Sequence, residues 1–400
     1  MAALFANLNA YYESQHSCGH DHHLPIINAI DISEWRKVYI ELAKQSYEGK
    51  LNPEDLNEDL VRNTYQELNK GAASGYGKGW STLSKNIPDK TALEIQKNLY
   101  RFSAAKSYVQ AVDINNALVK DGKIQNYRDF EAEVLKLNNQ YNLVYLQREY
   151  KSAIQGANMA KFWNQSQANK VYSNYKYKTQ GDDRVRDEHD AVNNTIAPKN
   201  SPWWATWWPP NGYGPCRCYV EETNEEPTQT LPSAVPNTPK EFQFNVGISG
   251  QVFKENGKVQ YPYFAIAKEQ PFFEQKVKNM YGNYTTKVIR EWGAKFLKGS
   301  ELKHKKIADK VVINNADIRS ITGKPHNEKA ERNLLLYNLI DDFATSTFIT
   351  QVLEKKDRKQ YKSWYYLKSK SGEFYYNVVE LKSGVFKLHA ITDSIKNKKK

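Results

Sequence analysis

The sequence predicts a multidomain α+β protein: a helical N-terminal region, a loop-rich central domain and a small C-terminal α+β domain with an antiparallel sheet. Its 400 residues exceed what one hydrophobic core usually supports, and 40% apolar with 26% charged residues is a globular composition. Apolar residues recur at helical spacing in the first half and alternate in the last hundred residues. The net charge of +12 is uneven, because residues 1–239 carry 26 basic and 28 acidic side chains but residues 240–400 carry 31 and 17.

These properties restrict the class of protein. Three cysteines are too few for a disulfide scaffold, so we expect a reduced, intracellular protein. The first residues do not resemble a signal peptide, and no uncharged apolar run reaches the roughly 18 residues of a membrane span, so we expect a soluble protein without a membrane span. The basic C-terminal part favours a polyanionic partner, with nucleic acid first and an anionic membrane surface second.

The first two helices are predicted from their terminal residues. Ser33 is expected to cap a helix that Gly49 ends. Asn52 and Pro53 form a cap followed by a proline, which is expected to open the second helix, and Gly71 is expected to end it.

Two longer helical patterns follow. The sequence Thr91-x-x-Glu94 is typical of a capping box and predicts a helix that runs to about Lys120. The next pattern covers residues 127–175, which is long for a helix in a compact domain. It predicts either a break near Gly156 or a long helix that serves as an assembly strut.

The rest of the chain divides by composition. We expect five segments: a helical assembly region at 1–177, a motif region at 178–220, a Pro-rich linker or surface wrap at 221–240, a mixed segment at 241–299 with a helix around 269–297, and a basic α+β domain at 300–400. In the last segment the pattern predicts a strand at 311–313, a helix at 328–343, and four strands at 348–353, 363–367, 373–381 and 385–391.

Polar residues are densest between residues 182 and 218. His189, Cys216 and Cys218 could supply three ligands to zinc, with Cys18 from a separate Cys/His-rich stretch as the fourth. The Cys-x-Cys spacing differs from the usual Cys-x-x-Cys. Three interpretations therefore stay open, which are a polar staple without metal, a structural zinc site and a catalytic site.

The order of this region resembles the signature of the phage Mu F-like minor head proteins, also called head morphogenesis proteins. The shared order is Asp-x-Arg-x-Arg-x-x-His, a Pro-Trp segment and Pro-Pro-Asn-Gly-Tyr-x-x-Cys-Arg-Cys, within residues 30–270. Two features depart from it: Asn193-Asn194 replaces the usual Asp-Gly turn, and the Trp residues are doubled. The resemblance implies that six residues of the motif define the fold and take no part in catalysis: Asp183, Arg184, Arg186, His189, Cys216 and Cys218.

The resemblance to head proteins also implies a location and partners. It implies a virion component present in few copies, associated with the portal and with capsid proteins, and needed for head assembly or DNA delivery. From the virion, a C-terminal effector domain would reach the cytoplasm of the bacterial host.

The last hundred residues favour nucleic acid as a ligand, either packaged DNA or host RNA. Residues 301–400 hold 21 basic and 12 acidic side chains, a net charge of +9, with aromatic residues between them. Basic and aromatic residues on one sheet suit single-stranded nucleic acid, although one face of the sheet must be core. The residues expected to contact it are Lys324, Arg332, Tyr376 and Trp364.

The order of a helix followed by a four-stranded meander in residues 300–395 is similar to the barnase–EndoU–colicin–RelE-like RNase superfamily. That resemblance implies RNA cleavage without a metal or other cofactor, and an immunity protein as a partner. The residues assigned to catalysis are His326, His389, Thr392 and Lys329. The alternative is a structural head protein whose basic C-terminal domain binds DNA or the portal without catalysis.

Overall fold

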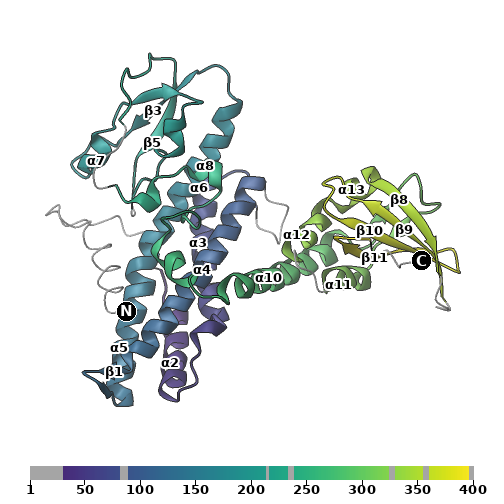
Figure 1. The fold of residues 1–400 in the computed structure, drawn as a ribbon, viewed down its shortest axis with the longest axis horizontal. Coiled ribbons are helices and arrows are strands. Elements are labelled where there is room, and N and C mark those ends of the chain that lie inside the picture. Colours follow the sequence, from purple (N-terminus) through teal and green to yellow (C-terminus); the bar gives the residue numbers. More distant parts are fainter. Residues whose placement is uncertain are drawn as a thin grey trace. The chain divides into compact units, whose positions relative to one another are not determined.

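The computed structural model describes residues 30–81, 89–212, 216–232, 238–323, 329–354 and 360–395 (Figure 1). The chain forms two compact units: residues up to 274, apart from 81–88, and residues 81–88 with 275–400. The predicted fold class is confirmed, because helices dominate the N-terminal part and antiparallel strands the C-terminal part. No helix in the described ranges is long and apolar enough to cross a bilayer. The finer segment boundaries stay predictions.

Helices fill the first part of unit 1. They are α2 (Ser33–Tyr47), α3 (Glu58–Tyr76), α4 (Lys90–Ala117), α5 (Tyr127–Asn138) and α6 (Leu146–Ala168), with the small hairpin β1 (Val119–Lys120) and β2 (Lys123–Ile124) between α4 and α5. The helix α3 packs against both α4 and α6. The most buried helix is α4, whose side chains Ile95, Leu99, Phe102 and Ile114 are inaccessible to solvent. Burial of this apolar surface stabilises the helical part of unit 1.

Gly49 follows the C-cap of α2 with φ of +69°, which confirms the predicted end of the first helix, but the other predicted ends of the first two helices differ from the structure. Ser33 is the first residue of α2 rather than its cap, and its N–H donates to Asp31 Oδ1. Asn52 caps only the 3₁₀ turn Pro53–Asp55, and Asn57 caps α3. Gly71 lies inside α3 and does not end it. Its missing side chain lets Tyr150 of α6 approach, since a Cβ at Gly71 would lie 2.9 Å from the Tyr150 carbonyl oxygen.

The two longer helical patterns are also interrupted elsewhere than expected. Asp89 caps α4, because its carboxylate accepts from the N–H of Ala92, whereas the predicted cap Thr91 lies inside the helix. Gly156 lies within an unbroken α6. The interruption is instead a π-helical turn at Asn139–Tyr145, and α6 ends at Ala168, before Tyr175. The long pattern is therefore two helices joined through a π turn.

A three-stranded antiparallel sheet follows α6. Its order is β4 (Ile196–Pro198), β3 (Asn174–Lys178) and β5 (Tyr219–Thr223), and α7 (Asp187–Asp190) precedes β4. Asn194 has φ of +62°, so the Asn-Asn pair that replaces the usual Asp-Gly turn forms a left-handed turn. Tyr175 of β3 packs edge-to-face on the buried rings of Trp204 and Trp208. The tryptophans thus form the core under this sheet.

Residues 238–274 return to the helices of unit 1. They contain a 3₁₀ turn (Lys240–Phe242), α8 (Val246–Ser249) and α9 (Pro262–Ala267). The Asn98 side chain of α4 accepts from the N–H groups of Val252 and Phe253, and donates to the Phe253 carbonyl. The rings of Phe102 and Phe253 stack with centroids 3.7 Å apart. These residues therefore complete the core of unit 1.

Unit 2 packs helices on one face of a sheet. Its helical segments are α10 (Phe273–Phe296), α11 (Asn315–Gly323), α12 (Lys329–Leu334), the 3₁₀ turn Leu335–Asn338 and α13 (Leu339–Thr345), so the helix expected at 328–343 is broken by the 3₁₀ turn. Its strands are β6 (Glu301–Leu302), β7 (Val311–Val312), β8 (Thr347–Leu353), β9 (Tyr361–Lys368), β10 (Tyr375–Leu381) and β11 (Phe386–Thr392). The sheet order is β6-β7-β11-β10-β9-β8, with β7 and β11 parallel and the other pairs antiparallel.

Candidate metal centre

The central sheet brings one histidine and two cysteines of unit 1 together. Cys218 directly precedes β5, and the side chain of Gln155 on α6 donates to its carbonyl oxygen at 2.7 Å. Cys216 lies two residues earlier, so both thiols project from one short extended segment. His189 lies on α7, in the connection between β3 and β4, and the cysteines lie just before β5. Because β3 pairs with both β4 and β5, the imidazole and the two thiols are brought close together.

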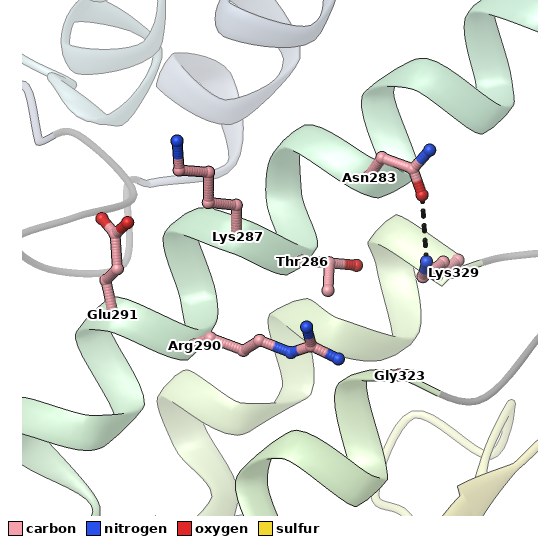
Figure 2. A pocket seen from close by; sticks show the side chains of 7 residues that line it. All are labelled: Asn283, Thr286, Lys287, Arg290, Glu291, Gly323 and Lys329. Carbon is pink, nitrogen blue, oxygen red and sulfur yellow. Dashed lines mark hydrogen bonds between the residues drawn. The ribbon is translucent and has the colours of Figure 1, made fainter.

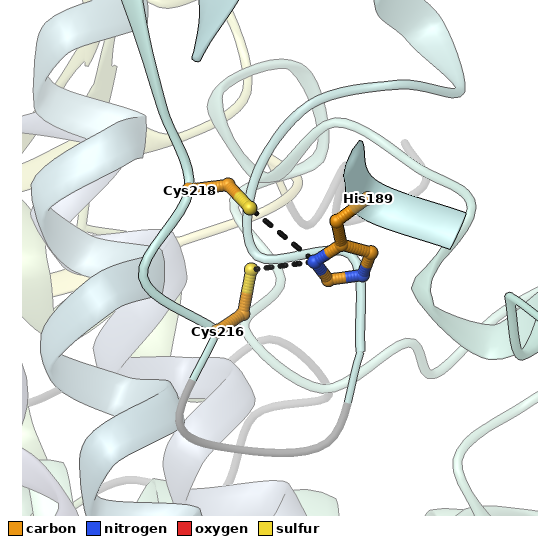
Figure 3. A group of neighbouring side chains, drawn as sticks. All are labelled: His189, Cys216 and Cys218. Carbon is orange, nitrogen blue, oxygen red and sulfur yellow. Dashed lines mark hydrogen bonds between the residues drawn. The ribbon is translucent and has the colours of Figure 1, made fainter. Parts of the chain in front are cut away.

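The three side chains point toward one another in a buried cluster (Figure 3). His189 Nδ1 lies 3.3 Å from Cys218 Sγ and 3.8 Å from Cys216 Sγ. All three ligand atoms lie within 4.8 Å of one another, and the residues are 3–5% exposed. Tetrahedral zinc with ordinary bond lengths separates nitrogen from sulfur by about 3.6 Å and two sulfurs by about 3.8 Å. The spacing of the three groups therefore fits zinc.

The second nitrogen of His189 fixes which tautomer faces the thiols. Nε2 lies 3.0 Å from the main-chain carbonyl oxygen of Asn211, which can only accept a hydrogen bond, so Nε2 carries the proton. Asn211 is itself held, because its side chain donates to the Phe242 carbonyl and accepts from the Tyr177 hydroxyl. A histidine oriented in this way by a carbonyl is common around protein-bound metals.

The electrostatics of the centre favour one thiolate. The hydrogen bond from Cys218 and the nearby His189 imidazole hold the pKa of Cys216 well below its usual range, although burial opposes this. The pKa of Cys218 is raised by its hydrogen bond to Cys216 and by burial. Burial lowers the pKa of His189, but the Cys216 thiolate outweighs it and the net shift is upward. The Cys216 thiolate and the protonated form of His189 therefore stabilise each other.

Two residues of the motif to which the sequence assigned no role also shape the centre. Asn211 supplies the carbonyl that orients His189. At Gly212 a Cβ would lie 2.7 Å from Arg186 Nη1, so a side chain there would require the guanidinium group to shift. The Asn-Gly pair of the motif was their signal in the sequence, but nothing there shows that the Asn acts through its main chain.

The charged residues of the motif are more exposed than His189 and the two cysteines. Asp182 rather than Asp183 makes the ion pair, as its carboxylate accepts from Arg217 Nη1 at 2.7 Å, so the two ends of the motif are linked. Asp183 and Arg184 are exposed, and Arg186 is half-buried beside Gly212. Cys18, the expected fourth ligand, lies outside the described residues.

Of the four residues assigned to catalysis, His389 and Thr392 lie on the same strand, β11, and Lys329 lies on α12. His326 lies outside the described residues. His389 on β11 packs edge-to-face on Trp364, with ring centroids 5.0 Å apart. The Thr392 hydroxyl donates to the Ser394 carbonyl, and Lys329 Nζ on α12 donates to Asn283 Oδ1 at 3.1 Å.

Two of the four residues expected to contact nucleic acid are buried. Tyr376 is inaccessible, and its hydroxyl is bonded to Asp342, so its ring offers no surface to a base. Alternation along β10 turns it to the core. Arg332 is 1% exposed and donates to the Asn333 side chain and the Thr322 carbonyl. Trp364 is half-buried on the opposite face from Tyr376, and Lys324 lies outside the described residues.

One comparison with known families places the centre. Residues 113–221 match the family described as Phage Mu protein F like protein, and this segment runs from the end of α4 to β5. It contains His189, Cys216 and Cys218. The resemblance to that family is therefore confirmed for this segment, and the match does not extend into unit 2. No curated protein and no solved structure matches the chain.

Proposed function

We propose that the chain is a phage head morphogenesis protein, carried in the virion near the portal in few copies. The match of residues 113–221 to the Phage Mu protein F like family carries this proposal. The matched segment holds a buried, preorganised polar centre, which suits a fold-defining role. Portal and capsid proteins are the proposed partners.

The experiment is deletion of the gene from its phage or prophage. We expect purified virions of the parent phage to contain the chain by mass spectrometry, and the deletion to lower the yield of filled heads in electron micrographs. A plasmid copy should restore the yield. Absence of the chain from virions, together with an unchanged yield of filled heads, would contradict the proposal.

We also propose that His189, Cys216 and Cys218 bind a structural zinc ion. Their mutual distances and the proton on Nε2 of His189 support it. Zinc in structural sites takes four ligands, and Cys18 remains the proposed fourth. The ion would hold α7 against the start of β5, and needs no role in catalysis.

For unit 2 we propose nucleic-acid binding by the sheet face opposite the core. Trp364, Tyr366 and His389 are half-exposed there, and Lys368 lies 5.9 Å from the ring of Tyr375. Half-exposed rings beside lysines suit the stacking of bases and the neutralisation of phosphates. Packaged DNA and host RNA are both candidate ligands.

The finer proposal is that unit 2 cleaves RNA without metal, using His326, His389, Thr392 and Lys329, and has an immunity protein as a partner. The full chain should cleave RNA in EDTA, and His326→Ala and His389→Ala should each lose most of that activity. Lys382→Gln, which removes an exposed charge, should keep it. Binding without any product would favour the alternative, a domain that holds DNA or the portal.

A further inference from the structure

A pocket of about 420 Å³ lies within unit 2, beside α10 (Figure 2). Its lining residues are Asn283, Thr286, Lys287, Arg290, Glu291, Gly323 and Lys329. Three of the seven are cations and one is an acid. The cations come from two elements, α10 and the start of α12, so folding of unit 2 gathers them around one hollow.

Two of these cations are fixed by neutral partners. Lys329 Nζ donates to the Asn283 side-chain oxygen at 3.1 Å. Arg290 Nε donates to the Thr322 hydroxyl at 2.8 Å, and its Nη2 to the Arg319 carbonyl at 3.3 Å. Within the described ranges, neither Lys329 nor Arg290 forms an ion pair with a carboxylate. Their positions are therefore set, while their charges stay available to an anion.

The end of α11 makes room for the guanidinium group. A Cβ at Gly323 would lie 2.7 Å from Arg290 Nη2, so a larger residue there would displace the arginine from the pocket wall. Thr286 is occupied otherwise, as its hydroxyl donates to the Gly282 carbonyl and accepts from Asn333. The cations, rather than this hydroxyl, are the groups that can meet a ligand.

A further positive charge lies close by. Arg332 is buried, and its positive charge acts on Lys329. The pKa of Lys329 is lowered first by partial burial and then by Arg332 and Arg290. Like charges held this near one another repel, and a bound anion relieves that repulsion.

We propose that this pocket binds a phosphate group of a nucleic acid strand. The inference rests on the proposed nucleic-acid role of unit 2 and adds to the exposed sheet face a second contact, on the helices α10, α11 and α12. Arg290 offers a planar set of donors that matches phosphate oxygens, and Lys329 and Lys287 add point charges. None of the described residues that line the pocket is aromatic, so we expect them to contact the phosphate backbone and not a base.

The test is binding of labelled single-stranded RNA and DNA to the full chain, followed by fluorescence anisotropy over a range of salt concentrations. We expect Lys329→Gln and Lys287→Gln each to weaken binding about 5-fold at 0.1 M salt, equally for different base sequences, and to reduce the salt slope by about 0.7. Lys295→Gln, an exposed lysine of α10 outside the pocket, is the matched control and should bind as the unsubstituted chain does.

The outcomes separate the pocket from the wider role of the unit. If the unsubstituted chain binds neither RNA nor DNA, the nucleic-acid role itself fails. If it binds but the pocket variants match it, or if Lys295→Gln loses as much as they do, the pocket is not the anchor. A mononucleotide that binds as tightly as the strand, and loses affinity in Lys329→Gln, would replace the strand with a free nucleotide as ligand.

Discussion

Cys218 Sγ lies 3.3 Å from Nδ1 of His189, although 29 residues separate the two in the sequence. The contact places the unprotonated nitrogen of the imidazole against a sulfur in a buried site, because the other ring nitrogen is held by a carbonyl. Loss of either group would leave the other buried and without its partner.

The first prediction concerns the metal. Protein purified without a histidine tag should contain about one equivalent of zinc by inductively coupled plasma mass spectrometry, and the Cys218→Ser variant should contain far less. Removal of zinc by a chelator should lower the melting temperature, because metal binding contributes folding free energy. Asp190→Asn, an exposed neighbour of His189, should keep its zinc. Less than a tenth of an equivalent in the unsubstituted chain would end the zinc proposal.

The second prediction concerns a buried ion pair in the helical part. Lys106 Nζ donates to Glu149 Oε2 at 2.6 Å and to the Tyr141 carbonyl at 2.8 Å, and both charged side chains are inaccessible. Lys106→Met leaves a buried carboxylate without its cation and should lower the free energy of unfolding in urea by about 3–5 kcal/mol.

Two variants test that interpretation of Lys106. Lys136→Met removes a lysine from an exposed pair with Glu133 and should change stability by less than about 1 kcal/mol. Adding Glu149→Leu to Lys106→Met should recover part of the loss, since the unpaired charge is gone. A double variant less stable than Lys106→Met would contradict the explanation.

The third prediction concerns the close approach of α3 and α6. A Cβ at Gly75 would lie 1.9 Å from the main-chain oxygen of Ile154, so Gly75→Ala must push the two helices apart. Overpacking of this kind costs about 1–3 kcal/mol, and backbone atoms cannot move aside as a side chain can. Thermal unfolding should show a clear loss for Gly75→Ala and none for Ser74→Ala, an exposed neighbour. Equal melting temperatures for the two would show that the helices do not approach this closely.

The fourth prediction concerns pH. Burial raises the pKa of Asp113 from 3.8 to about 7, although a hydrogen bond from Tyr141 opposes it, and burial raises that of Glu241 to about 7. A raised carboxyl pKa means that the folded state holds a proton which the unfolded state releases. Stability from these groups is therefore full below about pH 4 and falls as the pH rises to about 7.

Asp113→Asn tests this dependence. The shift for Asp113 corresponds to about 4 kcal/mol across that range at most. Urea unfolding at several pH values should show a shallower decline for Asp113→Asn, and Glu241→Gln should remove a further part. A decline as steep as that of the unsubstituted chain would show that Asp113 titrates normally.

Local patterns predicted the element types well and their ends less well. The alternation in residues 373–381 predicted a strand with one core face, and burial of Tyr376 identifies that face. Gly71 was expected to end a helix, because a glycine in a sequence does not show whether it turns the chain or admits another helix. That choice depends on Tyr150, which lies 79 residues further along.

Those residues of the candidate metal centre that act through their side chains were predictable from the sequence. His189, Cys216 and Cys218 were named from residue type, and the structure brings them together. The part played by Asn211 could not be found in that way, because it orients His189 through a carbonyl that every residue possesses. The engaged acid is Asp182, which fits the motif spacing but has an equally acidic neighbour.

The hydrogen bonds that the N–H groups of Val252 and Phe253 donate to the Asn98 side chain determine how short a fragment of unit 1 can be. The family-matched segment ends at residue 221, yet the stacked partner of Phe102 and both N–H donors to Asn98 come more than thirty residues later. A fragment cut at the Pro-rich stretch would expose that aromatic surface and invite aggregation. Fragments for biochemistry of unit 1 should therefore extend at least to residue 274.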